Sequence, residues 1–378
     1  MKRAALLFLL LCAALLCIGC APLQQALEQQ LNTANTVVIA AVQPQTEFSG
    51  LDTAALEKAA ENSTYTYQLL SAESESQQYE ALCAAAAEPS TAVLVADLSS
   101  RAYAPLIVRL AQKYGLPLIL CGVQPSAQTL AEYDNCWYVG FDPALAAEQQ
   151  AGLLIQAFRN GLVTDQNGDY KQSCLCVGSL ATLANQQSGY ASKLLQALEI
   201  GGIHVAAAAD MVTAADAETL AQRLDALLLP QTQAETIEEE TADGEIFTQL
   251  EEALAPAAAQ TELFICGDVM ATESVLQTVA ALHAAASEEA LAGLATPEQT
   301  YTVIGFGRSD AIEAALADGT LLGTVTQDTA AAAQAVYAIC ENLLQHESPT
   351  GGTDYHLNDN RSLMLNYQVL TADIKEPT

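Results

Sequence analysis

Positively charged side chains are scarce in this sequence. Lys and Arg together number 13 against 45 Asp and Glu, which gives a formal net charge of −32 at pH 7. Proteins that bind nucleic acid, or that dock electrostatically on an anionic bilayer, need Lys and Arg to neutralise phosphates. The composition therefore argues against both kinds of partner and indicates an acidic, self-repelling surface.

Aromatic residues are also few, at 6% of the chain, although 51% of the residues are hydrophobic. Ala is the most frequent of the apolar residues, which favours helices over an aromatic-rich β-sandwich. The length of 378 residues exceeds what one hydrophobic core usually supports. We therefore expect two domains that contain many helices.

Sequence motifs of common enzymes are absent. The chain has no G-x-S-x-G elbow, P-loop, G-x-G-x-x-G or H-E-x-x-H, and no nucleophile stands at a recognisable spacing from a base. We therefore expect that the protein is not an enzyme. A zinc site is not expected either, because no His pairs with Cys at ligand spacing; the four His are His204, His283, His346 and His356.

The N-terminal segment is typical of an export signal. Two basic residues precede an apolar run over 4–18, which is too short for a comfortable membrane span. The run ends in Cys17-Ile18-Gly19-Cys20, which resembles the lipobox of bacterial lipoproteins. We therefore expect residues 1–20 to form a lipoprotein signal peptide with lipid attached at Cys20, followed by a tether over 21–35. The protein would be extracytoplasmic and lipid-anchored to the bacterial cell membrane; the alternative is an ordinary secretory signal cleaved nearby.

Cysteines beyond this segment do not form a disulfide pattern. An odd number of them without a C-x-x-C spacing argues against a disulfide framework, and those in apolar strands act as small hydrophobic residues. The seven are Cys83, Cys121, Cys136, Cys174, Cys176, Cys266 and Cys340.

Apolar runs and amphipathic stretches alternate along the whole chain. Such alternation at short spacing predicts parallel strands joined by helical crossovers. In the first half we expect strands over 36–42, 65–70, 92–96, 116–120 and 136–141, with helices over 51–62, 76–87 and 101–114. In the second half we expect strands over 174–177, 203–209, 263–266, 301–306, 321–325 and 362–370, with helices over 142–160, 185–199, 214–228, 273–286, 309–317 and 329–345.

A polar loop enters the strand at 174–177 with oxygen-bearing side chains at alternate positions. Asp165, Asn167 and Asp169 are followed by Lys171 and Gln172. Alternating oxygen ligands closed by a backbone carbonyl are how a short loop wraps Ca²⁺. The spacing departs from an EF-hand, and an ordinary polar turn is the alternative because Asp, Asn and Gly are common turn formers.

Three features together resemble the type I periplasmic-binding-protein family, and in particular its galactose/glucose-binding branch in ABC sugar importers. They are the D-x-N-x-D loop, the strand that Glu262 opens before Gly267-Asp268-Val269-Met270-Ala271, and the segment Gly323-Thr324-Val325-Thr326-Gln327-Asp328. The resemblance implies two doubly wound parallel-sheet α/β domains with a hinge and an interdomain ligand cleft. It also implies a structural Ca²⁺ ion held by Asp165, Asn167, Asp169, Lys171, Gln172 and Glu262.

The same resemblance implies domain boundaries. The N-terminal domain would comprise 36–141 plus 328–363, and the C-terminal domain 142–327 plus 364–378. Residues 230–260 do not fit the strand–helix order, and we expect them to form an acidic surface insertion.

Ligands of open α/β sheets bind beyond the carboxyl ends of the strands. Arg308, which stands beside Gly307 where the family has an acid, would suit an anionic or acetylated ligand. Asp97 and Asp268 are equally good helix N-caps, and other sugar-binding positions of the family fall on Thr182, Ala184, Ser188 and Ala215. The candidate ligand residues are Phe48, Asp97, Asn185, Asp268, Arg308 and Gln327.

The family implies the following function. The chain would be the substrate-binding lipoprotein of an ABC importer, acting as a monomer that binds a monosaccharide or sugar-like molecule and delivers it to a membrane permease. An extracytoplasmic sensor on the same scaffold, which feeds a histidine kinase or chemoreceptor, is the alternative.

Overall fold

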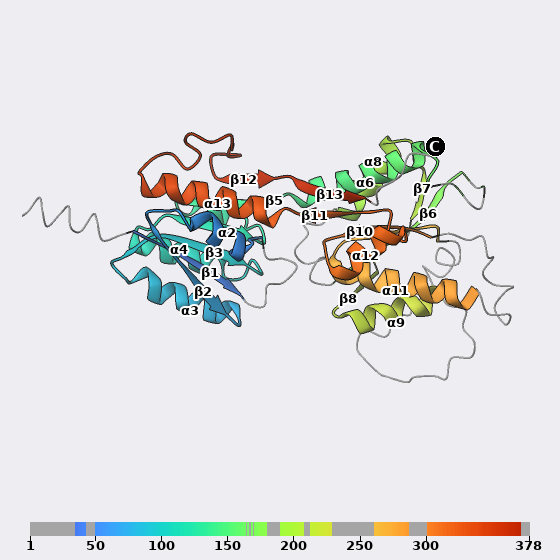
Figure 1. Ribbon diagram of the computed structural model, residues 1–378, viewed down its shortest axis with the longest axis horizontal. Coiled ribbons are helices and arrows are strands. Elements are labelled where there is room, and N and C mark those ends of the chain that lie inside the picture. Colours follow the sequence, from blue (N-terminus) through green and yellow to red (C-terminus); the bar gives the residue numbers. More distant parts are fainter. Residues whose placement is uncertain are drawn as a thin grey trace, which may run out of the picture. The chain divides into compact units, whose positions relative to one another are not determined.

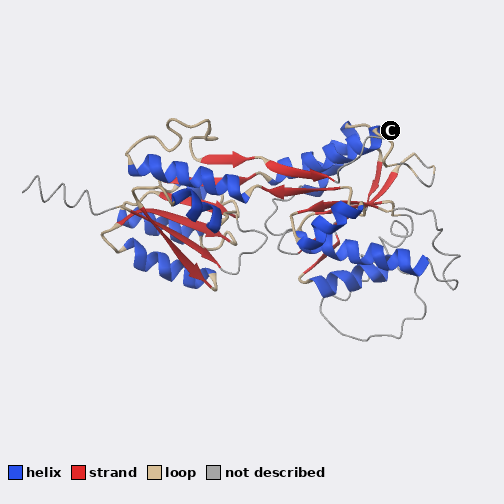
Figure 2. Cartoon of the chain, viewed as in Figure 1, coloured by secondary structure: helices blue, strands red, loops and turns tan. Residues whose placement is uncertain are grey.

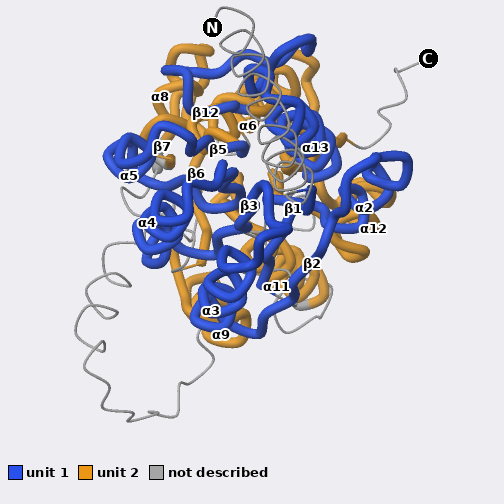
Figure 3. Tube along the Cα trace, turned by 90° about the vertical axis from the view of Figure 1, so that its left-hand side faces the viewer, with its two compact units in different colours: residues 1–140, 329–364 blue, residues 141–328, 365–378 orange. Residues whose placement is uncertain are grey.

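The chain forms two compact units in the computed structural model. The structure describes residues 35–42, 50–163, 165, 168, 170–179, 190–207, 212–228, 261–286 and 301–371. Unit 1 comprises residues 1–140 and 329–364, and unit 2 comprises residues 141–328 and 365–378 (Figure 3). Each unit is an α/β structure built on a mainly parallel sheet, which confirms the predicted fold class (Figure 2). Among the described helices, none has the length and apolar character needed to cross a membrane.

The sheet of unit 1 has six strands in the order β12-β5-β4-β3-β1-β2. β1 lies between β2 and β3 and pairs in parallel with both, and β3 pairs in parallel with β4. β1 is an unbroken apolar run because both of its faces are covered. The strands are β1 Thr36–Val42, β2 Thr66–Ala72, β3 Thr91–Leu98, β4 Leu118–Gly122, β5 Cys136–Phe141 and β12 Ser362–Leu365.

Helices cover both faces of this sheet. α3 and α4 bury Leu82 and Ile107 against Leu94 and Leu118 on one face. α2 and α13 pack together on the other (Figure 1). The short helix α5 was not predicted from the sequence. The helices are α2 Thr53–Ala60, α3 Glu75–Ala86, α4 Ala104–Tyr114, α5 Ala127–Ala131 and α13 Thr329–Leu344.

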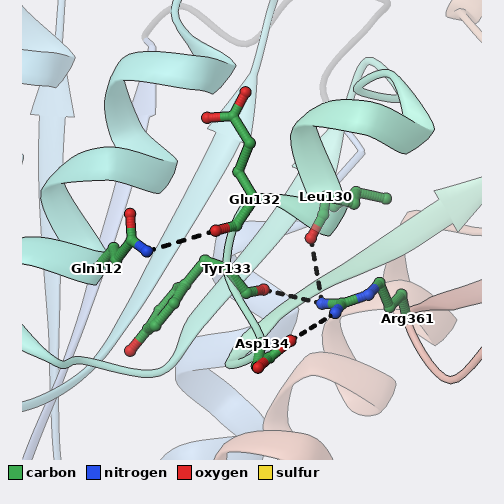
Figure 4. A network of polar contacts seen from close by, with 6 residues as sticks. All are labelled: Gln112, Leu130, Glu132, Tyr133, Asp134 and Arg361. Atoms are coloured by element: carbon green, nitrogen blue, oxygen red, sulfur yellow. Dashed lines mark hydrogen bonds and ion pairs between the residues drawn. The ribbon is translucent and has the colours of Figure 1, made fainter.

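Arg361 joins the C-terminal part of unit 1 to the turn between α5 and β5 (Figure 4). Its guanidinium group donates to the carbonyl oxygens of Leu130, at 3.1 Å, and Tyr133, at 2.8 Å, and to the Asp134 carboxylate, at 2.9 Å. The backbone continues the contact, because Tyr138 N donates to the Arg361 carbonyl oxygen. One planar cation thus satisfies carbonyl groups that the end of a helix leaves unpaired.

The sheet of unit 2 follows the order β13-β11-β10-β9-β6-β7, and β8 also pairs with β6. All these pairings are parallel except that of β13, which runs antiparallel to β11. The three-residue strand β8 was not predicted from the sequence. The strands are β6 Gln172–Ser179, β7 Val205–Ala207, β8 Val212–Ala214, β9 Leu263–Cys266, β10 Thr302–Phe306, β11 Gly323–Gln327 and β13 Tyr367–Thr371.

Helices cover both faces of the second sheet as well. α6 and α8 pack together on one face, whereas α9, α11 and α12 bury Leu220, Val275 and Ile312 against the other (Figure 1). α11 begins four residues earlier than predicted, because Asp268 caps it by accepting from Ala271 N at 2.7 Å. The helices are α6 Pro143–Arg159, α8 Tyr190–Ile200, α9 Ala217–Leu228, α11 Val269–Ala286 and α12 Asp310–Asp318.

The last predicted strand, over 362–370, was wrong in one respect. The structure divides it at the exposed residue Asn366 into β12 and β13, which belong to different sheets. The seven cysteines beyond Cys20 are all free thiols, and only Cys83 among them is partly exposed. The predicted signal, residues 21–34 of the predicted tether, the acidic insertion and the first residues of the predicted helix over 185–199 lie outside the described residues.

Candidate functional site

Asp97 stands at the carboxyl edge of the sheet in unit 1. It is the last residue but one of β3 and pairs with Cys121 on β4. Its side chain is buried, and Oδ1 accepts a hydrogen bond of 3.0 Å from Gly50 N. Asp97 caps no described helix, because α4 begins after Tyr103, so the capping interpretation of Asp97 was wrong.

Two glycines bring the backbone tightly against this carboxylate. A Cβ on Gly50 would lie 2.3 Å from Gly122 N, and a Cβ on Gly122 would lie 2.7 Å from Asp97 Oδ1. Gly122 also has a φ of 72°, a conformation that side chains rarely adopt. Tyr138 fixes the same turn, because its hydroxyl donates to the Gly122 carbonyl oxygen at 2.8 Å. The sequence did not single out either glycine, since their closeness depends on a contact between distant segments.

The protonation of Asp97 is shifted by this environment. Burial raises the pKa of the carboxyl group to about 7, against the lowering effect of the hydrogen bond from Gly50. A carboxyl group with such a pKa changes charge near neutral pH, which is a frequent property of functional sites.

Asp268 occupies the corresponding edge of unit 2, directly after β9. It is buried, and its two carboxylate oxygens accept from Ala271 N at 2.7 Å and Ser179 N at 2.5 Å. These bonds join β6 to the start of α11, so the capping alternative for Asp268 describes what the structure shows. Burial raises the pKa of the Tyr190 phenol. The negative charges of neighbouring groups, Asp268 among them, raise it further. The Tyr190 hydroxyl is buried and has no hydrogen-bond partner among the described residues.

Gly307, after β10, leaves no room for a side chain. Its φ is 81°, and a Cβ there would lie 2.2 Å from Cγ2 of Val269. The Gly307 carbonyl oxygen accepts from the Thr324 hydroxyl at 2.9 Å, and its N–H donates to the Val325 carbonyl oxygen. Val269 therefore occupies the space that an acidic side chain at position 307 would need.

Arg308 follows β10, and Gln327 is the last residue of the neighbouring strand β11. The Arg308 side chain is 61% exposed and pairs with Glu313, with 2.5 Å between Nε and Oε1. The Gln327 side chain is hydrogen-bonded to the Tyr367 hydroxyl, and burial raises the pKa of that phenol well above its usual value. Tyr367 was not predicted as part of this edge; its ring lies against Phe141, with centroids 5.3 Å apart.

The candidate calcium loop is described only in part. Asp165 accepts from two backbone N–H groups of its own loop, those of Gly168 and Tyr170, each at 2.7 Å. The Tyr170 side chain is exposed. Its backbone has a φ of 65°, a left-handed conformation that is costly for a bulky residue. The Asp165 carboxylate thus has two backbone donors within its own loop.

Gln172 opens β6, and Glu262 directly precedes the neighbouring strand β9. Ser173 N donates to Glu262 Oε2 at 3.1 Å, and Glu262 N donates to the Ser173 carbonyl oxygen at 2.9 Å. Both polar atoms of the Gln172 side chain are buried without a hydrogen-bond partner in the described chain. A buried amide oxygen without a partner and a buried carboxylate are oxygen donors of the kind that a hard cation takes. The described residues nevertheless contain no group of three or more His, Cys, Asp and Glu side chains arranged to hold a metal ion.

Five of the predicted site residues lie outside the described residues. The calcium candidates among them are Asn167 and Asp169, the ligand candidates are Phe48 and Asn185, and the lipid candidate is Cys20.

Comparison with known proteins identifies the family. The family model described as a periplasmic binding protein domain matches residues 36–348 of the chain. The chain belongs to the periplasmic binding protein family. This confirms the family expected from the calcium-like loop and the Gly323–Asp328 segment. No curated protein matches the chain.

Solved structures of periplasmic binding proteins share the fold. The glucose-galactose binding protein GanP from Geobacillus stearothermophilus has 14% identity and a TM-score of 0.58, with 90% of this chain and 99% of that chain covered. A periplasmic ribose ABC transporter protein from Conexibacter woesei has 15% identity and a TM-score of 0.60, covering 89% and 92%. An ABC transporter solute-binding protein from Actinobacillus succinogenes, with bound D-allose, has 16% identity and a TM-score of 0.55, covering 89% and 97%.

Proposed function

We propose that this periplasmic binding protein is the substrate-binding lipoprotein of an ABC importer and that it binds a monosaccharide or a sugar-like small molecule. The observation that carries the proposal is the family match over residues 36–348. The sugar class is supported by the similar folds of a glucose-galactose binding protein, a ribose ABC transporter protein and a solute-binding protein with bound D-allose.

The polar side chains at the carboxyl ends of the strands are the groups we assign to the ligand. In unit 1 this group is Asp97, and in unit 2 it is Gln327, which Tyr367 holds in place. Their chemistry suits binding without catalysis, because an amide and a carboxylate hold hydroxyl or amine groups by hydrogen bonds. The energy of binding would favour a ligand-bound conformation over others in the ensemble.

The proposed location follows from the N-terminal sequence. Cys20 stands at the end of a basic and apolar signal-like segment, and a lipid there would anchor the mature protein outside the cytoplasm. Replacement of Cys20 by Ser should release the protein from the membrane fraction. Retention of the variant in that fraction would contradict lipid anchoring at this residue.

A structural Ca²⁺ ion is the second part of the proposal. Asp165, Gln172 and Glu262 would supply oxygen ligands, together with Asn167, Asp169 and the backbone of Lys171. The support is a pair of buried groups: the amide of Gln172, without a partner among the described residues, and the carboxylate of Glu262. Bound Ca²⁺ would neutralise the carboxylates and give the amide oxygen a partner.

Thermal melting of residues 21–378 against hexoses and pentoses tests the function. We expect one sugar to raise the melting temperature by several degrees, because a ligand that binds only the folded state stabilises it by about 3 kcal/mol at a hundredfold excess over Kd. Gln327→Ala should reduce this shift, whereas Gln112→Ala, an exposed amide near the C-terminus of α4, serves as the matched control. A panel in which no sugar raises the melting temperature of the intact protein would contradict the sugar class.

A further inference from the structure

Asp97 is a buried carboxylate for which the described chain supplies no cation. Asp97 is 3% exposed to solvent. Four ion pairs occur among the described residues, and Asp97 belongs to none of them. Within the same residues, its carboxylate accepts one hydrogen bond, the one from Gly50 N.

Two side chains of the described residues that lie next to Asp97 are uncharged at neutral pH. Cys121 of β4 faces it as a thiol whose own pKa is raised by burial. The Gln78 side chain from α3 donates to the Asp97 carbonyl oxygen at 2.7 Å and not to the carboxylate. Arg101, the cation nearest in sequence, donates its Nε to the Gln124 carbonyl oxygen at 2.9 Å.

The fold does not need a charge at this position. An amide oxygen would accept the hydrogen bond from Gly50 as a carboxylate oxygen does. An ionised carboxylate without a counter-charge costs several kcal/mol more to bury than a neutral group of the same shape. The sequence carries the more costly group at the carboxyl edge of the sheet, where ligands of such folds bind.

Main chain packs closely around the carboxylate. Because Gly50 and Gly122 lack side chains, two segments of main chain approach each other and Asp97 Oδ1 to distances that a Cβ at either glycine would prevent. A carboxylate held among main-chain groups suits a small group that donates hydrogen bonds and carries positive charge.

We propose that Asp97 is the counter-ion of a protonated amine on the ligand, so that the sugar-like solute is an amino sugar. This inference rests on the proposed function and narrows its substrate class. Two further observations support a cation over an anion. The charge of Arg308 is already paired with Glu313, and the net charge of −32 attracts cations to the protein.

Matched sugars with and without the amine test the inference. Thermal melts and calorimetric titrations at pH 7 would compare D-glucosamine with D-glucose and D-galactosamine with D-galactose on the mature chain. We expect an amino sugar to bind at least tenfold more tightly than its neutral partner. Asp97→Asn should remove this preference, while Asp318→Asn, an exposed carboxylate at the end of α12, should keep it.

A pH series on the wild-type protein gives a second measurement that does not depend on a variant. Protonation of Asp97 removes its charge between pH 7 and pH 5, whereas the amine stays protonated, so the affinity for the amino sugar should fall by roughly tens of fold. The affinity for a neutral sugar should stay level over the same range.

The outcomes separate the inference from the proposed function. If a neutral sugar binds as tightly as its amino partner, or if the affinity for the amino sugar does not fall towards pH 5, the inference is wrong and sugar binding stands. If no compound of either kind binds, both the amino-sugar inference and the sugar class are wrong.

Discussion

Replacement of Asp97 by Asn should stabilise unit 1 at alkaline pH. The wild-type carboxyl group has a pKa of about 7 in the folded protein, raised by burial from an unfolded value of 3.8. Between these two values the folded state holds a proton that the unfolded state has released. The contribution of this group to stability therefore falls as the pH rises from about 4 to 7, and it stays level above pH 7.

The magnitude follows from the size of the shift. A difference of about three pKa units at about 1.4 kcal/mol each corresponds to about 4 kcal/mol above pH 7. Asn removes this cost and keeps an acceptor for Gly50 N, but its amide N–H groups need acceptors of their own, which offsets roughly 1–2 kcal/mol. A net gain of about 2 kcal/mol would raise the melting temperature by roughly 4–8 °C for a unit of this size.

Calorimetric melts of both proteins at pH 5 and pH 8 without ligand measure this effect. We expect the advantage of Asp97→Asn to be small at pH 5 and larger at pH 8. Asp318→Asn is a control of opposite sign, because hydrogen bonds from Thr320 lower the pKa of the Asp318 carboxyl group, and the stability from that shift is present above its unfolded pKa and lost on acidification. If Asp97→Asn melts below wild type at pH 8, the carboxylate is a structural requirement and the reasoning is refuted.

Three further substitutions test other parts of the structure. Arg361→Ala should cost about 2–3 kcal/mol in a chemical denaturation curve, because it leaves two carbonyl oxygens and one carboxylate without their donor; an unchanged midpoint would mean that water replaces the guanidinium group. Gly307→Ala should lower the melting temperature through both its φ of 81° and the 2.2 Å approach to Val269. The double variant with Val269→Ala should recover only the steric part, so complete recovery would show that the backbone is unstrained. Removal of Ca²⁺ by a chelator should destabilise wild type by about 3 kcal/mol and leave Glu262→Gln unaffected; equal effects on both proteins would argue against Glu262 as a ligand.

Most of the fold could be predicted from the pattern of apolar residues. Continuous apolar runs such as 36–42 belong to strands buried on both faces, and the strands at 136–141 and 263–266 have the predicted bounds. The strand predicted over 362–370 was wrong because its apolar residues alternate through Asn366 without interruption. The division at Asn366 arises because its two halves join two different sheets. The helix α11 was placed too late because the capping bond from Asp268 is formed by a side chain that also suited a ligand.

The candidate site could be predicted only at the level of strand ends. Asp97 and Gln327 were identified by their position at the ends of predicted strands, since the last residues of parallel strands lie at the same edge of the sheet. The partners of these residues could not be predicted, because Gly50 and Tyr367 come from distant parts of the chain and meet them through tertiary packing. Val269 fills the space beside Gly307, which likewise depends on packing and cannot be predicted from a local sequence pattern.

The buried thiols provide a built-in means of timing how each unit opens. In the folded protein only Cys83 of the seven is partly exposed, so an alkylating reagent should react there first. Each of the other six reacts only when its surroundings open, at a rate that depends on the local opening equilibrium. Cys121, Cys136 and Cys340 report on unit 1, and Cys174, Cys176 and Cys266 report on unit 2. Peptide mass spectrometry after timed alkylation would then give separate opening rates for the two units from the natural sequence, without an introduced label.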